Sequence, residues 1–345
     1  MRIGIWNTAF LGDTLLTLPL LQVLRTAYPK ASIDFWVRSS YCPLYEEQEG
    51  YTTYGYSKKS GLSGLRVLGQ KISSMKYSVW INPHPSYRSS YIMRESHAPI
   101  RISYTSPCIN RLLATHVIER NPHIHEVERL LSLTTPLGIA QQYTLPCYAL
   151  PPSVEEELVQ QGVADDKIAI SLAIGAMWKT KRWLPEYFGD LVRRSLDEGY
   201  IVYLVGGGSE EEAIAQQVLT HAKVRKGESV ISFLNASLPF TAGVLRKSTV
   251  CCGNDTGLMH LAWIQNTPTI ALYGPTVSEQ GFYPLSVGSK ALGIELSCRP
   301  CGKHGSHQCK KKHFQCMKEL SPQYVWQSIQ ECIVSRESYI RGDTQ

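Results

Sequence analysis

Charged and hydroxyl side chains follow several of the apolar, strand-like runs in this sequence. Asp13, within Gly12-Asp13-Thr14, comes directly after the run 2–6 and could act as a general base. The same carboxylate could instead cap a helix N-terminus, a common role for Asp in a strand-to-helix turn. The spacing alone leaves both interpretations open.

A cationic segment follows the apolar run 168–173. Three cations lie within four residues: Lys179, Lys181 and Arg182. Thr180, between the two lysines, can add a hydroxyl donor. A lysine ammonium with a neighbouring hydroxyl suits a pyrophosphate. A solvated basic loop is the alternative. The flanking Trp178 and Trp183 disfavour it, because large aromatic side chains are rarely left on an exposed loop.

A third segment, Asp255-Thr256-Gly257-Leu258, lies between the run 249–253 and a predicted helix over 258–264. Gly257 allows close backbone approach, and a helix N-terminus offers free N–H groups to a phosphate. Thr256 can donate a hydrogen bond. Asp255 beside an anion is expected to bind a sugar hydroxyl or to cap the helix. His260, one turn further, is typical of a packed helix histidine.

A fourth segment, Gly206-Gly207-Gly208, precedes three glutamates at the start of another predicted helix. Such a glutamate can hold a ribose diol, as acidic residues do in dinucleotide sites, or can complement the helix dipole. Neither a G-x-G-x-x-G nor a G-x-x-x-x-G-K-[ST] motif occurs. Their absence disfavours a nicotinamide or flavin enzyme and excludes a P-loop nucleotidase.

Four cysteines gather near the C-terminus, at Cys298, Cys301, Cys309 and Cys316. Four thiolates within nineteen residues could hold a structural Zn or Fe ion, although only the first pair has the C-x2-C spacing of a metal knuckle. Reduced structural thiols are the alternative. No secretion signal is recognised, so the cysteines are expected to be free thiols.

These segments need parallel sheets to position them. Alternating strand-like and helical patterns over 2–37 and again over 168–273 predict an α/β protein with two parallel sheets. Helices are expected over 14–27, 125–133, 185–196, 210–222 and 258–264. The first is expected either to be kinked at Pro19 or to have a regular part that begins near Pro19. Pro146, Pro151 and Pro152 predict a linker, which divides the chain into domains 1–152 and 153–345. Ligands are expected at the carboxyl ends of the strands, in a cleft between the halves.

Charge and length limit the function classes. The 345 residues carry a net charge of +6, and between Arg38 and Arg129 twelve Lys or Arg face seven Glu and no Asp. That surplus suits an anionic partner such as a phosphorylated glycan, a nucleic acid or an acidic lipid surface. No apolar run is long enough to span a bilayer, and we expect a cytoplasmic protein.

Taken in order, the motifs resemble those of the heptosyltransferases, glycosyltransferase family nine. The resemblance runs from Gly12-Asp13-Thr14-Leu15-Leu16 through His125-Glu126-Val127-Glu128-Arg129 and Lys181-Arg182-Trp183. Its most specific part is Asp255-Thr256-Gly257-Leu258-Met259-His260-Leu261-Ala262, which continues into Thr267–Thr276. Residues 40–120 carry the least recognisable motif.

The resemblance implies a GT-B fold, in which two Rossmann-like, doubly wound domains face each other across a cleft. It implies an N-terminal acceptor domain, a C-terminal donor domain, and inverting transfer of heptose from ADP-heptose without a catalytic metal. Asp13 would be the base. The donor would be bound by Thr180, Lys181, Glu211, Asp255, Thr256, Gly257, Leu258 and His260.

By the same resemblance the acceptor is an anionic glycolipid of the lipopolysaccharide core, with peripheral contact to the inner membrane and no nucleic acid as partner. Two enzyme alternatives stay open: a heptosyltransferase that modifies protein, and a GT-B transferase or epimerase that uses another nucleotide sugar. A third, from another class, is a non-catalytic nucleotide-sugar- or nucleic-acid-binding protein. No organised aromatic and basic platform for nucleic acid is recognised.

Overall fold

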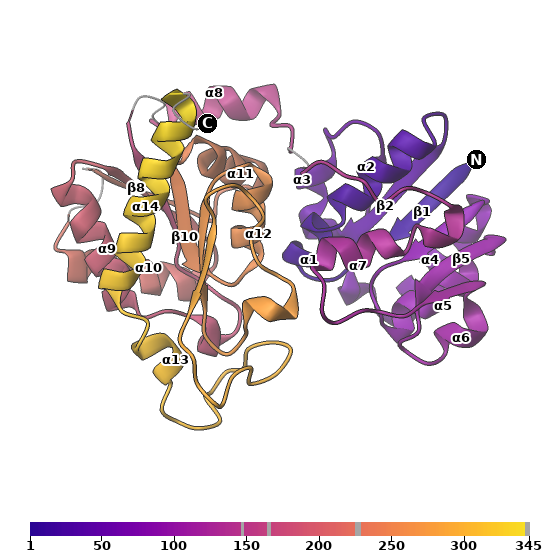
Figure 1. The fold of residues 1–345 in the computed structure, drawn as a ribbon. Coiled ribbons are helices and arrows are strands. Elements are labelled where there is room, and N and C mark those ends of the chain that lie inside the picture. The colour runs from indigo at the N-terminus through magenta and orange to yellow at the C-terminus, as the bar shows by residue number, and fades with distance from the viewer. Residues whose placement is uncertain (146–147, 164–166, 225–228, 342–345) are drawn as a thin grey trace. The chain divides into compact units, whose positions relative to one another are not determined.

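The computed structural model describes residues 1–145, 148–163, 167–224 and 229–341. The chain forms two compact units, Met1–Ala149 and Leu150–Gln345. Each unit contains one six-stranded sheet with helices packed on it (Figure 1). The expected pair of parallel α/β sheets is therefore confirmed.

All strand pairs of the first unit are parallel, in the order β3-β2-β1-β4-β5-β6. The strand order reverses between β1 and β4, which makes the carboxyl ends of these two strands the switch point of the sheet. The strands are β1 Arg2–Trp6, β2 Ser32–Arg38, β3 Thr52–Tyr56, β4 Val79–Asn82, β5 Ile100–Tyr104 and β6 His116–Ile118.

The helix expected over 14–27 is two helices. A short helix, α1, ends at Leu15, and α2 starts at Leu18 with Pro19 as its second residue, where a missing N–H is tolerated. The helices of this unit are α1 Leu11–Leu15, α2 Leu18–Ala27, α3 Cys42–Tyr45, α4 Gly61–Ser74, α5 Tyr87–Glu95, α6 Asn110–Leu113 and α7 Glu126–Ser132. Single 3-10 turns are η1 Ser39–Tyr41, η2 Lys58–Ser60 and η3 Thr135–Leu137.

Tryptophans from three adjacent strands form the aromatic part of the first core. Trp6 of β1 lies 6.1 Å from Trp36 of β2 and 6.5 Å from Trp80 of β4, ring centre to ring centre, and all three are buried. Gly4 makes room for this layer, because a Cβ there would lie 2.5 Å from the Trp80 ring. This packing fixes β1, and with it the turn that carries Asp13.

The second sheet repeats the arrangement of the first. Its strands run in parallel in the order β12-β11-β10-β7-β8-β9, so the reversal falls between β7 and β10. The strands are β7 Ala169–Ala173, β8 Ile201–Gly206, β9 Val230–Leu234, β10 Val250–Asn254, β11 Thr269–Tyr273 and β12 Lys290–Gly293. Every residue of β7, β10 and β11 is buried, as expected of strands covered on both faces.

Helices flank this second sheet. The long C-terminal helix α14, yellow in Figure 1, packs against α9 and against β10 and β11. The helices are α8 Pro152–Gln160, α9 Pro185–Asp197, α10 Ser209–Ala222, α11 Leu238–Lys247, α12 Gly257–Ile264, α13 Gln315–Lys318 and α14 Pro322–Arg341, with 3-10 turns η4 Lys179–Lys181 and η5 Ser278–Gln280. Within the described residues, no helix has the length and apolarity needed to cross a membrane.

Candidate functional site

Asp13 lies at the switch point of the first sheet, in the first turn of α1. Its Oδ2 atom accepts a hydrogen bond of 3.1 Å from the backbone N–H of Phe10, the residue that caps this helix. Asp13 thus makes the capping contact that the sequence left open. No donor from the described part of this unit reaches Oδ1, and the side chain is partly exposed, so one carboxylate oxygen is left for chemistry.

Buried polar side chains hold the turn that carries Asp13. Asn7 Nδ2 donates to the Asp13 carbonyl at 3.0 Å and to Thr17 Oγ1 at 2.8 Å. Thr17 Oγ1 donates to the same carbonyl at 2.9 Å. Because Asn7 and Thr17 are almost fully buried, these bonds fix the backbone at Asp13.

The surroundings raise the pKa of Asp13 to about 6. Desolvation is the largest cause, and the negative charge of Glu126 adds to it. The Phe10 N–H and the cations Arg120 and Arg38 act in the opposite direction. A carboxyl group with a pKa near neutrality is well matched to accept a proton at physiological pH.

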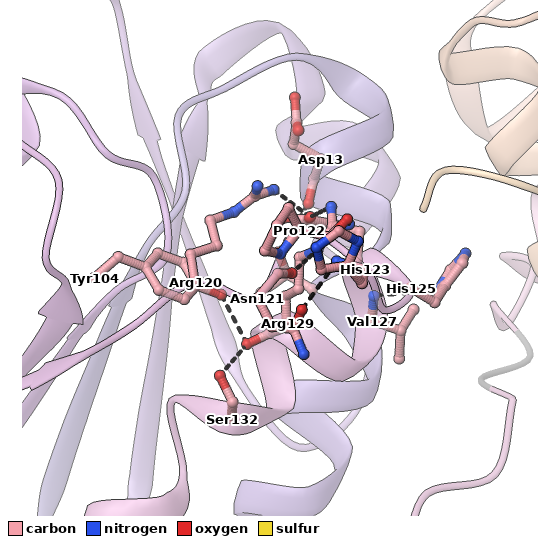
Figure 2. A network of polar contacts seen from close by, with 12 residues as sticks. Asp13, Tyr104, Arg120, Asn121, Pro122, His123, His125, Val127, Arg129 and Ser132 are labelled. Carbon is pink, nitrogen blue, oxygen red and sulfur yellow. Dashed lines mark hydrogen bonds and ion pairs between the residues drawn. The ribbon is translucent and has the colours of Figure 1, made fainter. Parts of the chain in front are cut away.

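Glu126, the first residue of α7, pairs with two arginines. These arginines, Arg120 and Arg129, are labelled in Figure 2. The Glu126 Oε2 atom is paired with Arg120 and lies 3.0 Å from Arg129 Nη1. Arg129 also donates to two backbone carbonyls, and its own carbonyl accepts from Tyr104 and Ser132. The network therefore fixes Glu126 and Arg120, two of the charges that act on Asp13. The Glu-x-x-Arg spacing was visible in the sequence, but its role was not predicted.

A group of cations gathers at the carboxyl ends of β2, β3 and β4. Arg38 stacks 4.7 Å from the Phe10 ring centre, and Arg88 lies 6.0 Å from that of Tyr56. Burial, together with Arg38 and Arg88, lowers the pKa of Lys58. Burial, Lys58 and Arg38 lower the pKa of His84 to about 4.

The cation group is defined here as Arg38, Lys58 and Arg88 together with the neighbouring His84, whose imidazole is neutral at pH 7. Its three cations repel one another. No described carboxylate forms an ion pair with Arg38, Lys58 or Arg88. Asp13 is the acid that acts on Lys58 from a distance. Clustered cations without carboxylate partners are typical of an anion site.

In the second unit, Lys181 and Asp255 meet at the corresponding switch point. Lys181 Nζ lies 2.5 Å from Asp255 Oδ2 and 3.2 Å from the Asp255 carbonyl oxygen. Thr276 Oγ1 donates to the same Oδ2 atom at 2.7 Å. Asp255 is 7% exposed, so this contact joins two of the expected donor-binding residues in a mostly dry environment.

Asn254 ties together the strand ends on which Lys181 and Asp255 stand. Its Oδ1 atom accepts from the Trp183 backbone at 2.9 Å, and its Nδ2 atom donates to the carbonyls of Ile174 and Gly175. The side chain is fully buried. No role for Asn254 or Thr276 was predicted from the sequence.

Thr180 uses its hydroxyl within the protein. The Oγ1 atom donates to the Ser306 carbonyl at 2.8 Å and accepts from the Ser306 backbone N–H at 2.8 Å. The Thr180 backbone N–H donates to the same carbonyl at 3.0 Å. Since a hydroxyl has a single hydrogen to donate, Thr180 as it lies here anchors residue 306 and has no hydrogen left for a phosphate.

Among the three glutamates of α10, Glu211 faces the ends of β7 and β8. Its Oε2 atom accepts from the Gly207 N–H at 2.7 Å, and its carboxyl group fills the space where Gly175 and Gly206 lack a Cβ. Glu210 points elsewhere, to Arg182, and Glu212 pairs with Asn235. Burial raises the pKa of Glu211, as desolvation does for a carboxyl group.

The N-terminus of α12 lies beside Asp255. Thr256 occupies the cap position without a side-chain capping bond, and Thr256, Gly257 and Leu258 are each partly exposed. Their position leaves the first N–H groups of the helix accessible to an anion. His260 is 4% exposed, and its Nδ1 atom accepts from Trp263 Nε1 at 3.1 Å, which fits a packed helix histidine.

The four clustered cysteines are free thiols; three of them lie in a loop, and Cys316 is buried in α13. Cys298 Sγ lies 3.8 Å from His313 Nε2, and Cys301 Sγ lies 3.2 Å from the Cys298 carbonyl oxygen. Burial raises the pKa of Cys316 to about 11. Burial acts in the same direction at Cys309, but four backbone N–H groups from Lys311 to Phe314 outweigh it and lower that pKa.

A tetrahedral metal needs three or four converging ligands. In the part of the chain that the structure describes, no three Cys, His, Asp or Glu side chains are arranged to hold a metal ion. The Zn or Fe site that the cysteine spacing suggested therefore stays a prediction.

Comparison with known proteins identifies the family of the chain. Residues 65–313 match the family model described as glycosyltransferase family 9 (heptosyltransferase). The chain is 24% identical to lipopolysaccharide heptosyltransferase 2 of Escherichia coli K12, over 98% of this chain and all of that protein. It is 25% identical to lipopolysaccharide heptosyltransferase 1 of Pseudomonas aeruginosa, over 98% of this chain and 99% of that protein.

Solved structures have the same fold. A family 9 glycosyl transferase from Veillonella parvula superposes with a TM-score of 0.84 at 23% identity and covers 97% of both chains. E. coli ADP-heptose heptosyltransferase II gives 0.80 at 21% identity, over 98% of this chain and all of that one. The GT-B fold expected from the sequence is thus confirmed. Because the family model covers well over half of its length, the chain belongs to glycosyltransferase family 9, the heptosyltransferase family.

Proposed function

We propose that this protein transfers heptose from ADP-heptose to an anionic glycan of the lipopolysaccharide core, with inversion at the anomeric carbon. The observation that carries the proposal is Asp13, a partly exposed carboxylate with a pKa of about 6 at the switch point of the first sheet. The names of the relatives support the choice of sugar and acceptor.

On the donor side, the proposed ligands surround the Lys181–Asp255 pair. The ADP diphosphate would replace the Asp255 carboxylate as the partner of the Lys181 ammonium. It would also accept hydrogen bonds from the N–H groups at the start of α12, around Thr256, Gly257 and Leu258. Asp255, still held by Thr276, would then accept from heptose hydroxyls. Lys181 and the helix N-terminus stabilise the leaving diphosphate as its charge grows.

The remaining donor residues have supporting roles in this proposal. Glu211 would bind the ribose hydroxyls, since its carboxylate is the one of the three that faces the strand ends. Thr180 would act by holding Lys181 in place, because its hydroxyl hydrogen is donated to Ser306. His260 would support the helix from below through its buried contact with Trp263.

In the transfer step the acceptor hydroxyl oxygen bonds to the anomeric carbon while the bond to the ADP oxygen breaks. Asp13 takes the hydroxyl proton, and ADP leaves with the bonding electron pair. Such a general base contributes about 10²–10⁴-fold in rate. At pH 7 a carboxyl group with a pKa near 6 is mostly ionised and is still a stronger base than an ordinary aspartate.

The acceptor is proposed to be anionic because of the cation group Arg38, Lys58, His84 and Arg88. These side chains come from the strand ends next to the Asp13 turn and have no carboxylate partners of their own among the described residues. Phosphate or carboxylate groups of an inner-core glycan would supply the missing charge. Such an acceptor is anchored in lipid, so we also propose a cytoplasmic enzyme in peripheral contact with the inner membrane.

The test is ADP release from ADP-heptose, with and without a truncated lipopolysaccharide acceptor, by the wild type and by Asp13→Ala. The proposal expects acceptor-dependent release that falls by at least about a hundredfold in the variant. Release with protein acceptors, or with another nucleotide sugar only, would favour the corresponding alternative enzyme. Full biological activity of Asp13→Ala would favour a binding protein.

A structural metal at Cys298, Cys301, Cys309 and Cys316 is kept as a separate hypothesis, and no step of the proposed reaction depends on it. The four N–H groups around Cys309 support it, because they stabilise a thiolate. A structural relative at 12% identity and TM-score 0.57, TibC of E. coli, is described as iron-containing. Elemental analysis of the purified protein decides: less than about 0.1 Zn or Fe per chain would reject the hypothesis.

A further inference from the structure

The loop between Cys298 and Cys316, here called the cysteine loop, is fastened to the proposed donor site. Three hydrogen bonds join Ser306 of the loop to Thr180, which adjoins Lys181 in η4. At the near end of the loop, the Cys301 N–H donates to the Pro275 carbonyl, next to Thr276. The loop therefore contacts two of the segments that hold the Lys181–Asp255 pair.

The contact at Gly305 is as close as the backbone allows. A Cβ on Gly305 would lie 2.7 Å from Trp178 Cβ, 2.9 Å from Lys181 Cγ and 3.1 Å from Thr180 Oγ1. These distances are too short for any larger residue without displacement. The backbone of the loop thus passes directly over the Lys181 side chain, and the residue before the glycine, His304, is brought next to it.

His304 is an exposed imidazole surrounded by the charges of this site. Lys181 of η4, Asp255 after β10 and Lys303 of the same loop all act on it. Desolvation is the largest cause that lowers the pKa of His304. The charges of Lys181 and Lys303 lower this pKa further, and the charge of Asp255 raises it. In the free protein these causes favour the neutral form of His304, which lies near Lys181, a cation that already has Asp255 as its partner.

We propose that His304 is a further donor-binding residue, which joins Lys181 and the N-terminus of α12 around the donor diphosphate. This inference rests on the proposed function above. Its geometry comes from the fastening of the loop at Ser306 and from the contact of Gly305 with Lys181. An imidazole that is protonated when the diphosphate arrives makes a charge-assisted hydrogen bond to it.

Protonation and donor binding are then linked. The diphosphate brings negative charge beside His304 and neutralises Lys181, so the imidazole gains a proton on binding. By linkage, donor affinity rises as the pH falls through the range in which His304 titrates. ADP-heptose is a diphosphate diester with no group of its own that titrates between pH 6 and 8, so it is a clean probe of this effect.

The experiment measures the dissociation constant of ADP-heptose, without acceptor, by titration calorimetry at pH 6 and pH 8. The variants are His304→Gln and the matched control His307→Gln. His307 lies on the same loop, but its ring is 5.1 Å from that of Trp178, and Glu210 is the acid that it acts on. Both side chains are exposed, so neither change is expected to affect folding.

The expected result is a loss of affinity at pH 6 of about three- to tenfold for His304→Gln, as for one hydrogen bond to a charged group near solvent. The loss should be smaller at pH 8, and His307→Gln should match the wild type. If His304→Gln binds ADP-heptose with the same dissociation constant as the wild type at both pH values, this inference is wrong and the proposed function is unaffected. A wild type that binds no ADP-heptose at either pH would overturn the proposed function and the inference with it.

Discussion

Replacing Asp13 with asparagine should stabilise the protein at neutral pH while it abolishes transfer. Asparagine has almost the same shape and can still accept from the Phe10 N–H at the start of α1. It lacks the charge that the surroundings disfavour. The position would then be one where function is maintained at the expense of stability.

The pKa of Asp13 sets the size of this effect. A rise of the pKa from its ordinary value of 3.8 to about 6 means that the folded state binds the proton more tightly than the unfolded state does. Stability contributed by this group is therefore present below about pH 4 and is lost as the pH rises to about 6. The full difference corresponds to about 3 kcal/mol, and solvent screening of the partly exposed carboxylate reduces it to about 2 kcal/mol.

The assay is urea denaturation of the wild type and Asp13→Asn at intervals from pH 4 to pH 8. The two proteins should be equally stable near pH 4, and the variant should gain about 2 kcal/mol by pH 7.5. Asp197→Asn is the control, because that side chain is 66% exposed. A difference between wild type and Asp13→Asn that stays constant with pH, or a less stable variant at pH 7.5, would refute the reasoning.

Three further outcomes are expected. The acid limb of the kcat/KM profile should lie near pH 6, and Glu126→Gln should move it to lower pH because the change removes a negative charge near Asp13. The control Glu128→Gln, on the same helix, should leave the limb in place. An unshifted limb in Glu126→Gln would contradict the electrostatic argument. Lys181→Met should raise the KM for ADP-heptose by about tenfold or more in steady-state assays, and an unchanged KM would remove this residue from the donor site. Gly253→Ala should lower the free energy of unfolding by about 2 kcal/mol in urea titrations, because its Cβ would lie 2.5 Å from the Cβ of Ala173 in β7. A variant as stable as the wild type would show that β7 and β10 can move apart at no cost.

Much of the second unit could be predicted from the sequence because its strands are buried on both faces. Continuous apolar runs such as 168–173 and 201–205 stand out from any surface segment, and the polar turns after them mark strand ends. Asp13 and Asp255 were placed at such ends for this reason. The structure places both at the switch points of their sheets.

Residues 40–120 were predicted least well. Only one of the five residues of β3 is buried, and the strand contains no aliphatic side chain. The strand β6 has three residues, two of them exposed. Edge strands of this kind have little apolar pattern to recognise, because one neighbour and one face are missing. The helices α4 and α5 between them were likewise not predicted.

The sequence by itself determined the family, the two repeated α/β patterns and the residue types at the strand ends, because these follow from local periodicity and from contiguous motifs. Only the tertiary structure decided which of those residues meet. Lys181 contacts Asp255 from 74 positions away, and Thr180 contacts Ser306 from 126. Contacts at such separations, like the cation group around Asp13, depend on how the strands are ordered in the sheet, and strand order leaves no trace in local sequence.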